Sequence, residues 1–280
     1  MQYLLYNPFS GNNCSHEDAL SYAVVVHTPT KLVNITEIHS MRVFFETLEP
    51  HDDVIIFGGD GTLNRIINQL SDVQINNDLY FYSSGTGNDF ARDVGREGAQ
   101  NPFLINEYIK NLPTVTVNEK KSRFINGVGF GIDGYCCEVG DELKAQGKQP
   151  NYTAIAIKGL LFHFKPVTAK VSVDGKEMEF KKVWIAPTMY GRYYGGGMMA
   201  TPKQNRNADD KTVSLMLFHG SSKLKTLMIF PSIFTGKHVK NSKYISIFEG
   251  KSISVSFDRP SPLQIDGETI LNVTKYSVEV

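Results

Sequence analysis

Two glycine-rich stretches carry the residue types that hold the phosphates of a nucleotide. The first, GGDGT at 58–62, follows an apolar run at 54–57 that predicts a buried strand and precedes residues with helical spacing. Glycines let the backbone approach a ligand, and free N–H groups at a helix start attract phosphate. Asp60 would repel phosphates unless a cation lay between them, and Mg²⁺ is commonly held by one or two carboxylates. We therefore predict a phosphate and Mg²⁺ site here, with Thr62 as the helix cap.

The second stretch, GTGNDF at 85–90, repeats this arrangement after a predicted strand at 79–82. Its helix is expected to begin at Asn88 or Asp89, and Asp89 is a second carboxylate for Mg²⁺. A turn of composition NPFSG at 7–11 offers further donors to a nucleotide. Neither GxGxxG nor GxxxxGK[ST] occurs, which excludes two common nucleotide fingerprints. One glycine turn is ordinary in an α/β protein, whereas two suggest that both face one nucleotide.

These motifs, together with DGE at 266–268, resemble those of the diacylglycerol kinase catalytic-domain family. That family includes soluble bacterial diacylglycerol kinases and has sphingosine and ceramide kinases as relatives. The resemblance spans nearly the whole chain, in the family's order. NAD kinases share the GGDG turn, so the discrimination rests on GTGNDF and DGE. The resemblance implies an ATP- and Mg²⁺-dependent kinase that transfers phosphate to a lipid hydroxyl, most simply that of diacylglycerol.

The resemblance also assigns roles to individual residues. Glu268 matches the family's proposed general base, which takes the proton of the lipid hydroxyl, and Asp60 is the other expected catalytic residue. Without the resemblance, Asp266 and Gly267 read as a hairpin turn with Glu268 as its solvated flank. The residues expected to bind ATP are Asn7, Ser10, Gly58, Gly59, Gly61, Thr62, Gly85, Thr86, Gly87, Asn88 and Asp89.

A segment at 207–215, NADDKTVSL, resembles the family's structural Mg²⁺ loop. By position, Asp210 would supply the carboxylate, and Asn207 and Thr212 would supply backbone carbonyls. Lys211 departs from the family pattern, because a cation there competes with a metal. Thr116 departs as well, since some relatives carry an Asp tied to the active-site metal at that place. Asp133 fits either a metal-associated carboxylate or a helix cap, and we favour the cap.

The order of predicted elements indicates an α/β fold with two domains. Up to about residue 112, strands alternate with helices, which predicts a mostly parallel sheet covered on both faces. Later strands follow one another, with a hairpin signal at 174–175, and predict an antiparallel β-sandwich. We place a three-layer α/β nucleotide-binding domain at 1–120 and a β-rich lipid-substrate domain at 121–280. The resemblance implies an active site in the cleft between them. Glycines 127, 129 and 131 alternate, leaving one strand face bare for close backbone or ligand approach.

Composition limits the partners and the location of the chain. The sequence has 29 basic and 29 acidic residues, so no overall field attracts nucleic acid. Three cysteines without metal spacing fit a reducing cytoplasm, and no apolar run approaches the ~20 residues of a membrane span. We expect a soluble cytoplasmic protein, peripheral at the inner membrane face where its lipid substrate lies. Exposed sheet edges can pair with a second copy of the chain, so a homodimer is compatible with the sequence.

Two stretches, 157–165 and 223–240, mix apolar and basic residues. They fit either a surface that lies on lipid headgroups or ordinary core helices, and we favour the core interpretation.

Two alternatives to the lipid kinase stay open. An NAD kinase-like phosphotransferase shares the GGDG turn but is disfavoured by GTGNDF. A catalytically weak lipid- or nucleotide-binding protein is kept open by the departures at Lys211 and Thr116.

Overall fold

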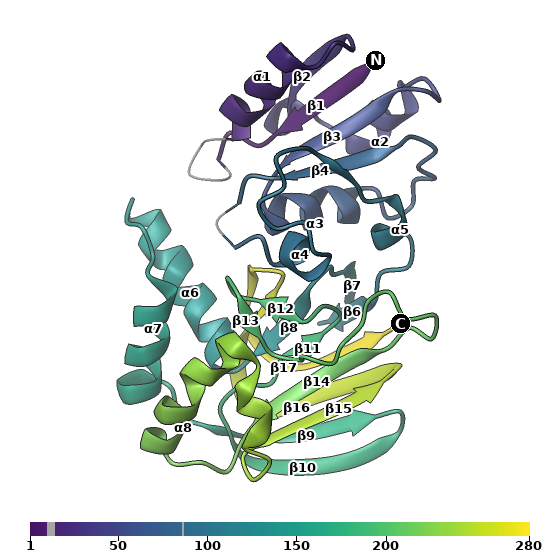
Figure 1. Ribbon diagram of the computed structural model, residues 1–280. Helices are drawn as coiled ribbons and strands as arrows, with labels where there is room; N and C mark the ends of the chain where they lie inside the picture. Colours follow the sequence, from purple (N-terminus) through teal and green to yellow (C-terminus); the bar gives the residue numbers. More distant parts are fainter. Residues whose placement is uncertain (10–14, 86) are drawn as a thin grey trace. The chain divides into compact units, whose positions relative to one another are not determined.

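The computed structural model describes residues 1–9, 15–85 and 87–280. They form two compact units, residues 1–112 and 113–280 (Figure 1). Strand Thr114–Val117 belongs to the second unit, so the division follows Leu112. Each unit has its own sheet and core. Among the described residues, no helix is long and apolar enough to cross a membrane.

The first unit is built on a five-stranded sheet in the order β2-β1-β3-β4-β5. Strands β2, β1, β3 and β4 run parallel to one another, and β5 is antiparallel to β4. The strands are β1 (Gln2–Tyr6), β2 (Thr30–Asn34), β3 (Asp53–Gly58), β4 (Leu79–Ser83) and β5 (Phe103–Leu104). The helices are α1 (Ser15–Val25), α2 (Met41–Glu46), α3 (Asp60–Gln69), α4 (Asp89–Asp93) and α5 (Asn106–Ile109), with a 3₁₀ turn at Ile35–Glu37.

Helices cover both faces of this sheet because alternate strand residues point to opposite sides. On one face Leu4, Ile55 and Phe57 pack with Ala19 of α1. On the other face the ring of Tyr3 meets Phe44 of α2, and the ring of Phe81 meets Phe90 of α4. The predicted three-layer α/β arrangement is confirmed.

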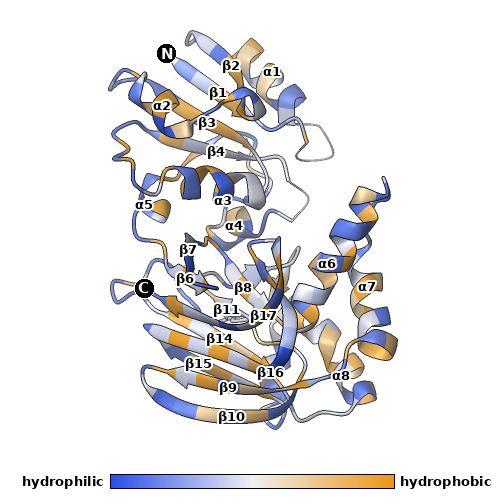
Figure 2. Ribbon diagram, turned by 180° about the vertical axis from the view of Figure 1, so that it is seen from behind, coloured by the Kyte–Doolittle hydropathy of each residue, from blue (hydrophilic) through white to orange (hydrophobic). Residues whose placement is uncertain are grey.

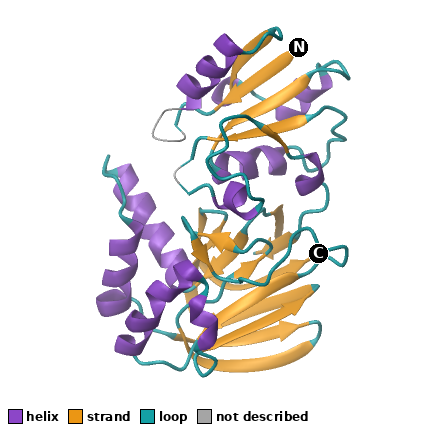
Figure 3. Cartoon of the chain, in the orientation of Figure 1, coloured by secondary structure: helices purple, strands orange, loops and turns teal. Residues whose placement is uncertain are grey.

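The second unit contains a ten-stranded sheet whose assigned pairings are all antiparallel (Figure 3). Its path runs β15-β14-β11-β8-β16-β17-β6-β7, with β9 joining β10 and β16. The strands are β6 (Thr114–Val117), β7 (Lys120–Arg123), β8 (Gly127–Phe130), β9 (Val167–Val173), β10 (Lys176–Val183), β11 (Thr188–Met189), β14 (Val213–Phe218), β15 (Ile245–Gly250), β16 (Ser252–Ile265) and β17 (Glu268–Glu279). A separate pair is formed by β12 (Tyr193–Tyr194) and β13 (Met198–Met199).

The long strand β16 joins two parts of this sheet. Its first half pairs with β9 and its second half with β8, and its register against β17 shifts after Ser256. Such a shift bends a strand, so that its two halves can pair with different neighbours. The rings of Phe257 on β16 and Phe130 on β8 stack with their centroids 3.7 Å apart. The predicted antiparallel β domain is thereby confirmed.

Three helices stand along one side of the second sheet (Figure 1). They are α6 (Ile132–Ala145), α7 (Tyr152–Lys158), which continues as a π-helix at Gly159–His163, and α8 (Lys223–Ile229). Two 3₁₀ segments follow α8 at Phe230–Thr235 and Lys237–Lys240. Their buried side chains form one cluster with the sheet, including Leu160, Phe164, Trp184, Ile229 and Phe230.

The glycine face of β8 differs from the expected bare surface. A methyl group on Gly127 would lie 2.5 Å from Met189 Sδ, and one on Gly129 would lie 2.5 Å from the Gln264 side chain. At Gly131 it would lie 2.6 Å from the carbonyl oxygen of Trp184. The close approach that these glycines allow is therefore made by the protein's own atoms.

Two helical glycines give a matched test of packing between α6 and β16. A β-carbon on Gly134 of α6 would lie 1.9 Å from the carbonyl oxygen of Pro262, whereas one on Gly61 of α3 meets nothing within 4 Å. We expect Gly134→Ala to lower the free energy of unfolding by about 2 kcal/mol or more through overpacking. Gly61→Ala should leave it equal or raise it by up to about 1 kcal/mol. Urea unfolding followed by circular dichroism measures both, and equal stabilities would contradict the packing described.

Candidate functional site

The first glycine turn connects β3 to α3. Gly59 is the N-cap of α3, and Asp60 is its first residue. The predicted cap at Thr62 is wrong, because the helix begins two residues earlier and Thr62 lies in its first turn. The Thr62 hydroxyl accepts a hydrogen bond from Asn7 Nδ2 at 3.1 Å, which ties the end of β1 to α3. A β-carbon on Gly58 would lie 2.8 Å from Thr62, so this crowded position requires glycine.

The carboxylate of Asp60 joins the two glycine turns. It accepts hydrogen bonds from the backbone N–H of Asp89 at 2.8 Å and of Phe90 at 3.4 Å. The turns also touch directly, since a β-carbon on Gly85 would lie 2.6 Å from the α-carbon of Gly59. The two motifs therefore lie side by side, as their shared composition indicates.

The second turn leaves several buried oxygens without an assigned partner. Asn88 has a left-handed backbone (φ 50°) and precedes α4. Its Oδ1 atom and the hydroxyls of Ser83 and Ser84 are buried and lack a hydrogen-bond partner among the described residues. Unsatisfied buried polar atoms cost free energy, so this surface suits a polar ligand. The residues fit the phosphates and sugar of a nucleotide.

Asp89 is held by its neighbours on α4. Its side chain is 5% exposed and forms an ion pair with Arg92 at 3.6 Å. Arg92 also pairs with Glu97 at 2.5 Å, and this pairing lowers the pKa of Glu97. Asp60 and Asp89 thus bring two carboxylates to the paired turns, and carboxylates are ligands that Mg²⁺ prefers.

The structure brings most of the predicted nucleotide residues together. These are Asn7, Gly58, Gly59, Gly61, Thr62, Gly85 and Asn88, around Asp60 and Asp89. Gly87 lies between the second turn and α4. Ser10 and Thr86 lie outside the described residues.

The DGE motif forms a hairpin tip between β16 and β17. Asp266 and Gly267 have positive φ angles of 46° and 94°, and Glu268 begins β17 opposite Ile265. The Asp266 carboxylate accepts backbone N–H bonds from Ile125, Asn126 and Gly127 at 2.5, 2.8 and 2.9 Å. This fixes the tip on the start of β8, and Glu268 beside it is exposed.

A buried arginine supports the strand on which this hairpin rests. Arg206 Nη2 donates to Asn126 Oδ1 at 3.2 Å, and its guanidinium lies 5.6 Å from the Tyr190 ring centre. Gln264 Oε1 accepts the N–H of Gly267 at 2.8 Å. Neither Arg206 nor Gln264 is predicted from the sequence, because neither forms a motif with the DGE residues. A lone Arg or Gln carries no local signal.

The loop predicted to hold structural Mg²⁺ is bound by side chains of the protein. Asp210 pairs with Lys251 Nζ at 2.6 Å, Lys211 Nζ donates to the Arg206 carbonyl at 2.5 Å, and the Thr212 carbonyl accepts from Gln204 Nε2 at 2.8 Å. Asn207 is exposed. No group of three or more His, Cys, Asp or Glu residues suited to a metal occurs in the described part of the chain. These oxygens already have cationic or amide partners, so the arrangement suits Mg²⁺ poorly, and the assignment of Asn207, Asp210 and Thr212 stays a prediction.

Asp133 does not cap α6 as expected, since the N-cap is Gly131 and no side chain caps the helix. Asp133 is instead buried near Tyr194, and its Oδ2 and the Tyr194 hydroxyl have no assigned hydrogen-bond partner among the described residues. Burial raises the pKa of Asp133 to about 7, although the nearby Tyr194 hydroxyl lowers it somewhat. Burial and the nearby Asp133 raise the pKa of Cys136, and they raise that of Cys137 to about 12. Both thiols are therefore protonated at neutral pH.

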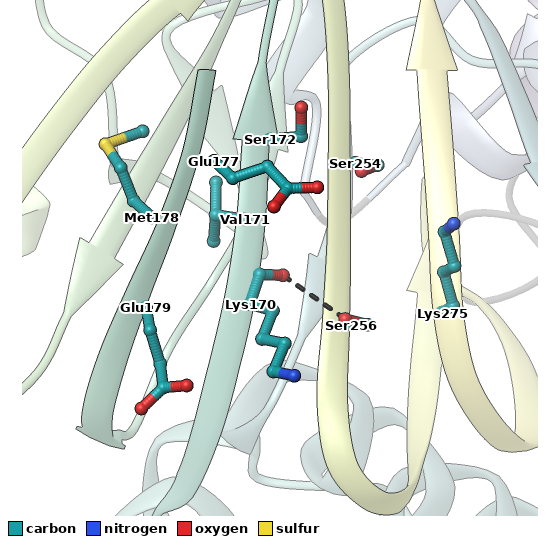
Figure 4. Close-up of a pocket in the computed structure, with 9 residues that line it drawn as sticks. All are labelled: Lys170, Val171, Ser172, Glu177, Met178, Glu179, Ser254, Ser256 and Lys275. Carbon is teal, nitrogen blue, oxygen red and sulfur yellow. Dashed lines mark hydrogen bonds between the residues drawn. The ribbon is translucent and has the colours of Figure 1, made fainter. Parts of the chain in front are cut away.

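A shallow depression of about 400 Å³ lies elsewhere, on strands β9, β10, β16 and β17 (Figure 4). Lys170 and Lys275 alternate there with the hydroxyls of Ser172 and Ser254, and Glu177 and Glu179 border it. It contains none of the predicted site residues. The mixed charges give no single chemistry, so we do not place the site there.

Comparison with known proteins adds an independent line of evidence. Residues 2–116 match the family described as diacylglycerol kinase catalytic domain, and residues 126–279 match the YegS C-terminal NAD kinase beta sandwich-like domain. The chain is 28% identical over 244 residues to the "Putative lipid kinase YtlR" of Bacillus subtilis, covering 80% of this chain and 75% of that protein. It is 25% identical over 267 residues to a "Diacylglycerol kinase" of Mycobacterium tuberculosis, covering 90% and 83%.

A solved structure supports the fold. The crystal structure titled as a putative diacylglycerol kinase from Bacillus anthracis superposes with a TM-score of 0.69 at 20% identity, covering 99% of this chain and 91% of that one. At this identity the likeness concerns the fold alone.

The buried carboxyl of Asp133 predicts a pH-dependent stability. Its pKa rises on folding from 3.8 to about 7, so the native state holds a proton that the unfolded state releases. This contribution to stability is complete below pH about 4 and is lost as pH rises toward about 7, by about 1.4 kcal/mol per unit. Asp133→Asn keeps the shape without titrating, so the stability of wild type relative to Asp133→Asn should fall by a few kcal/mol between about pH 4 and about pH 8. Urea unfolding measures it, and a difference independent of pH would contradict the prediction.

Proposed function

Because the chain belongs to the diacylglycerol kinase catalytic-domain family, we propose that it is an ATP- and Mg²⁺-dependent lipid kinase acting on a primary lipid hydroxyl. Diacylglycerol is the proposed acceptor, and phosphatidic acid is the product. The single observation that carries this proposal is the bond between the two glycine turns through Asp60. It assembles one phosphate-binding surface from two motifs that are 27 residues apart by their first glycines, Gly58 and Gly85.

The first unit binds the phosphoryl donor in this proposal. ATP would supply the γ-phosphoryl group, and Mg²⁺ held by Asp60 and Asp89 would neutralise charge on its oxygens. The backbone N–H groups at the start of α3 hold phosphate oxygens, and the lack of a side chain at Gly85 lets the two turns lie against each other. Asp60 and Asp89 orient the cation, and the orphaned oxygens of Ser83 and Asn88 accept bonds from the nucleotide.

The second unit supplies the base. Glu268 takes the proton of the lipid hydroxyl, whose oxygen forms a bond to the γ-phosphorus while the bond between that phosphorus and the leaving oxygen of ADP breaks. Asp266 is a positioning residue, because its three backbone hydrogen bonds fix the tip that carries Glu268. Thr269 adds a second restraint by donating to Asp141 of α6 at 2.7 Å.

Transfer of labelled γ-phosphate from ATP to diacylglycerol in mixed micelles tests this function. Wild type should produce labelled phosphatidic acid, and Glu268→Gln should lower kcat by about 10²-fold or more because the base is lost. Glu268 is exposed at the start of β17, so the glutamine variant should fold as wild type does.

Parallel reactions with NAD and with other lipid alcohols decide between the alternatives. Label in NADP alone would show an NAD kinase-like phosphotransferase. Nucleotide binding without transfer to any acceptor would show a binding protein. Label in phosphatidic acid that persists in Glu268→Gln would keep the lipid kinase and remove Glu268 as its base.

A binding measurement tests the nucleotide site independently of the catalytic base. A methyl group at position 85 would press on the Gly59 backbone and lie 2.9 Å from Asn88 Oδ1, so Gly85→Ala should push the turns apart. We expect at least about tenfold weaker binding of a non-hydrolysable ATP analogue, by calorimetry, which corresponds to about 1.4 kcal/mol. Glu268→Gln is the matched control and should bind the analogue as wild type does. Unchanged affinity in Gly85→Ala would place the phosphates elsewhere.

A further inference from the structure

We propose that the ammonium group of Lys211 takes the place of a metal ion in the loop before β14 and, through this loop, positions the DGE hairpin. The loop is segment 200–212, between β13 and β14. The family resemblance implies Mg²⁺ here, whereas the contacts of the loop favour an internal cation. The inference deepens the proposed function and rests on it, because the hairpin carries the proposed base, Glu268.

Two carbonyl oxygens of the loop are bonded to side chains of the protein. Lys211 Nζ donates to the carbonyl oxygen of Arg206 at 2.5 Å. Gln204 Nε2 donates to that of Thr212 at 2.8 Å, and Gln204 Oε1 accepts a hydrogen bond from the Ser214 hydroxyl. Mg²⁺ requires a nearly octahedral set of oxygens at about 2.0–2.1 Å, whereas an ammonium group can act on a single carbonyl. This donor set therefore suits an ammonium ion better than Mg²⁺.

The carboxylate expected to bind Mg²⁺ has another partner. Asp210 pairs with Lys251 Nζ at 2.6 Å, and its side chain is 77% exposed. Lys251 belongs to the turn between β15 and β16, outside the loop. A divalent cation on the loop carbonyls would have to break this ion pair and come close to the Lys211 ammonium group, which repels it. The electrostatics of the segment thus favour the lysine over a metal.

Lys211 is connected to the DGE hairpin through buried groups. Its bond fixes the backbone of Arg206, and the buried Arg206 side chain donates through Nη2 to Asn126 Oδ1 at 3.2 Å. The backbone N–H of Asn126 in turn donates to the Asp266 carboxylate at 2.8 Å. Asn126 is itself buried, and breaking the bonds of a buried polar group costs free energy. Movement of the loop is therefore transmitted to the start of β8, which holds the hairpin tip.

The far end of the loop is anchored in the core. The loop enters β14 at Val213, and all six residues of this strand are buried and mostly apolar (Figure 2). Thr212, directly before the strand, donates its hydroxyl to Glu249 of β15 at 2.7 Å. Lys211 lies two residues before β14, so its bond ties the Arg206 backbone to a rigid strand. Lys211 is a positioning residue in this proposal, and not a catalytic one.

Thermal unfolding without nucleotide tests whether the loop binds a metal. Wild type and Asp210→Asn are compared in Mg²⁺, in Ca²⁺ and in EDTA. The pair of Asp210 with Lys251 is exposed and contributes little, so both proteins should melt at similar temperatures in EDTA. Any rise with a divalent cation should be equal in the two proteins, because the loop takes no part in it. A rise in wild type that Asp210→Asn removes would overturn the proposal, because it would place a metal in the loop.

Hydrogen exchange tests the connection to the hairpin. Lys211→Met nearly keeps the length of the side chain and removes the ammonium group. The amides of residues 125–127, which donate to Asp266, should exchange at least about tenfold faster in this variant. Amides of β1 and β3 in the first unit are the reference for general destabilisation and should exchange as in wild type.

Two further variants are matched controls for the exchange measurement. Lys211→Arg retains a cationic donor and should recover most of the protection at 125–127. Lys203 is an exposed lysine of the same loop, so Lys203→Met removes an equal charge and should leave exchange unaltered.

Kinetics of transfer to diacylglycerol in mixed micelles add a functional readout. Lys211→Met should lower kcat by about tenfold, because a displaced base reacts slowly, and should leave the KM for ATP unchanged. The residues proposed to bind ATP belong to the first unit, whereas Lys211 belongs to the second. A merely structural loss of stability would leave the kcat of the folded enzyme unaltered, so the fall in kcat separates positioning from stability.

Each result decides the proposal. Exchange at 125–127 that is equal in Lys211→Met and wild type overturns the positioning role, and Lys211→Arg that behaves as Lys211→Met overturns the role of the charge. Faster exchange confined to segment 200–212 also overturns positioning, because the loop would then move without affecting the hairpin. Unfolding and exchange as expected, with no transfer to any lipid by wild type, would keep the role of Lys211 and reject the proposed function. Label in phosphatidic acid with an unchanged kcat in Lys211→Met would do the reverse.

Discussion

Hydrogen bonds from backbone N–H groups to a carboxylate organise the candidate site in each unit. Asp60 receives them from the second glycine turn, and Asp266 receives them from the start of β8. A bond to a charged group contributes about 1.5–3 kcal/mol, which is more than a neutral one, and it also sets direction. The neighbouring geometry follows from these bonds. Gly59 and Gly85 are brought into contact, and Glu268 projects from a tip that has several separate attachments.

The sequence predicted the fold class and most elements because their signals are local. Apolar runs before glycine turns gave β3 and β4, and the dipeptide at 174–175 gave the hairpin of β9 and β10. Features that depend on remote contacts were missed. The start of α3 at Asp60 accompanies the bond between Thr62 and Asn7, 55 residues away, and the glycine face of β8 is filled by residues from other parts of the chain. Arg206 and Gln264 act through Asn126 and Gly267, and no spacing along the chain announces such pairs.

The loop around Lys211 shows how one substitution changes the electrostatics of a segment. The sequence identified Lys211 as a competitor of a metal, and the structure gives its ammonium group a definite role on the Arg206 carbonyl. That bond connects the loop to the residue that supports Asn126, and so to the strand beneath the DGE hairpin. The pair of Asp210 and Lys251 is exposed, and exposed ion pairs contribute little to stability. The bonds to backbone carbonyls at Arg206 and Thr212 therefore do more to shape this loop than the ion pair does.

Segments 157–165 and 223–240 show where periodicity reaches its limit as a predictor. Periodicity favoured core helices, and Leu160, Phe164, Ile229 and Phe230 are indeed in the core. The same segments also contain Phe162, Leu224 and Met228, which bury little area and so add little to folding stability. A hydrophobicity pattern counts both sets alike, because it records residue type and not which side of a helix meets the sheet. Only the packed structure separates the two sets. The stability of the fold does not explain why the exposed set is apolar.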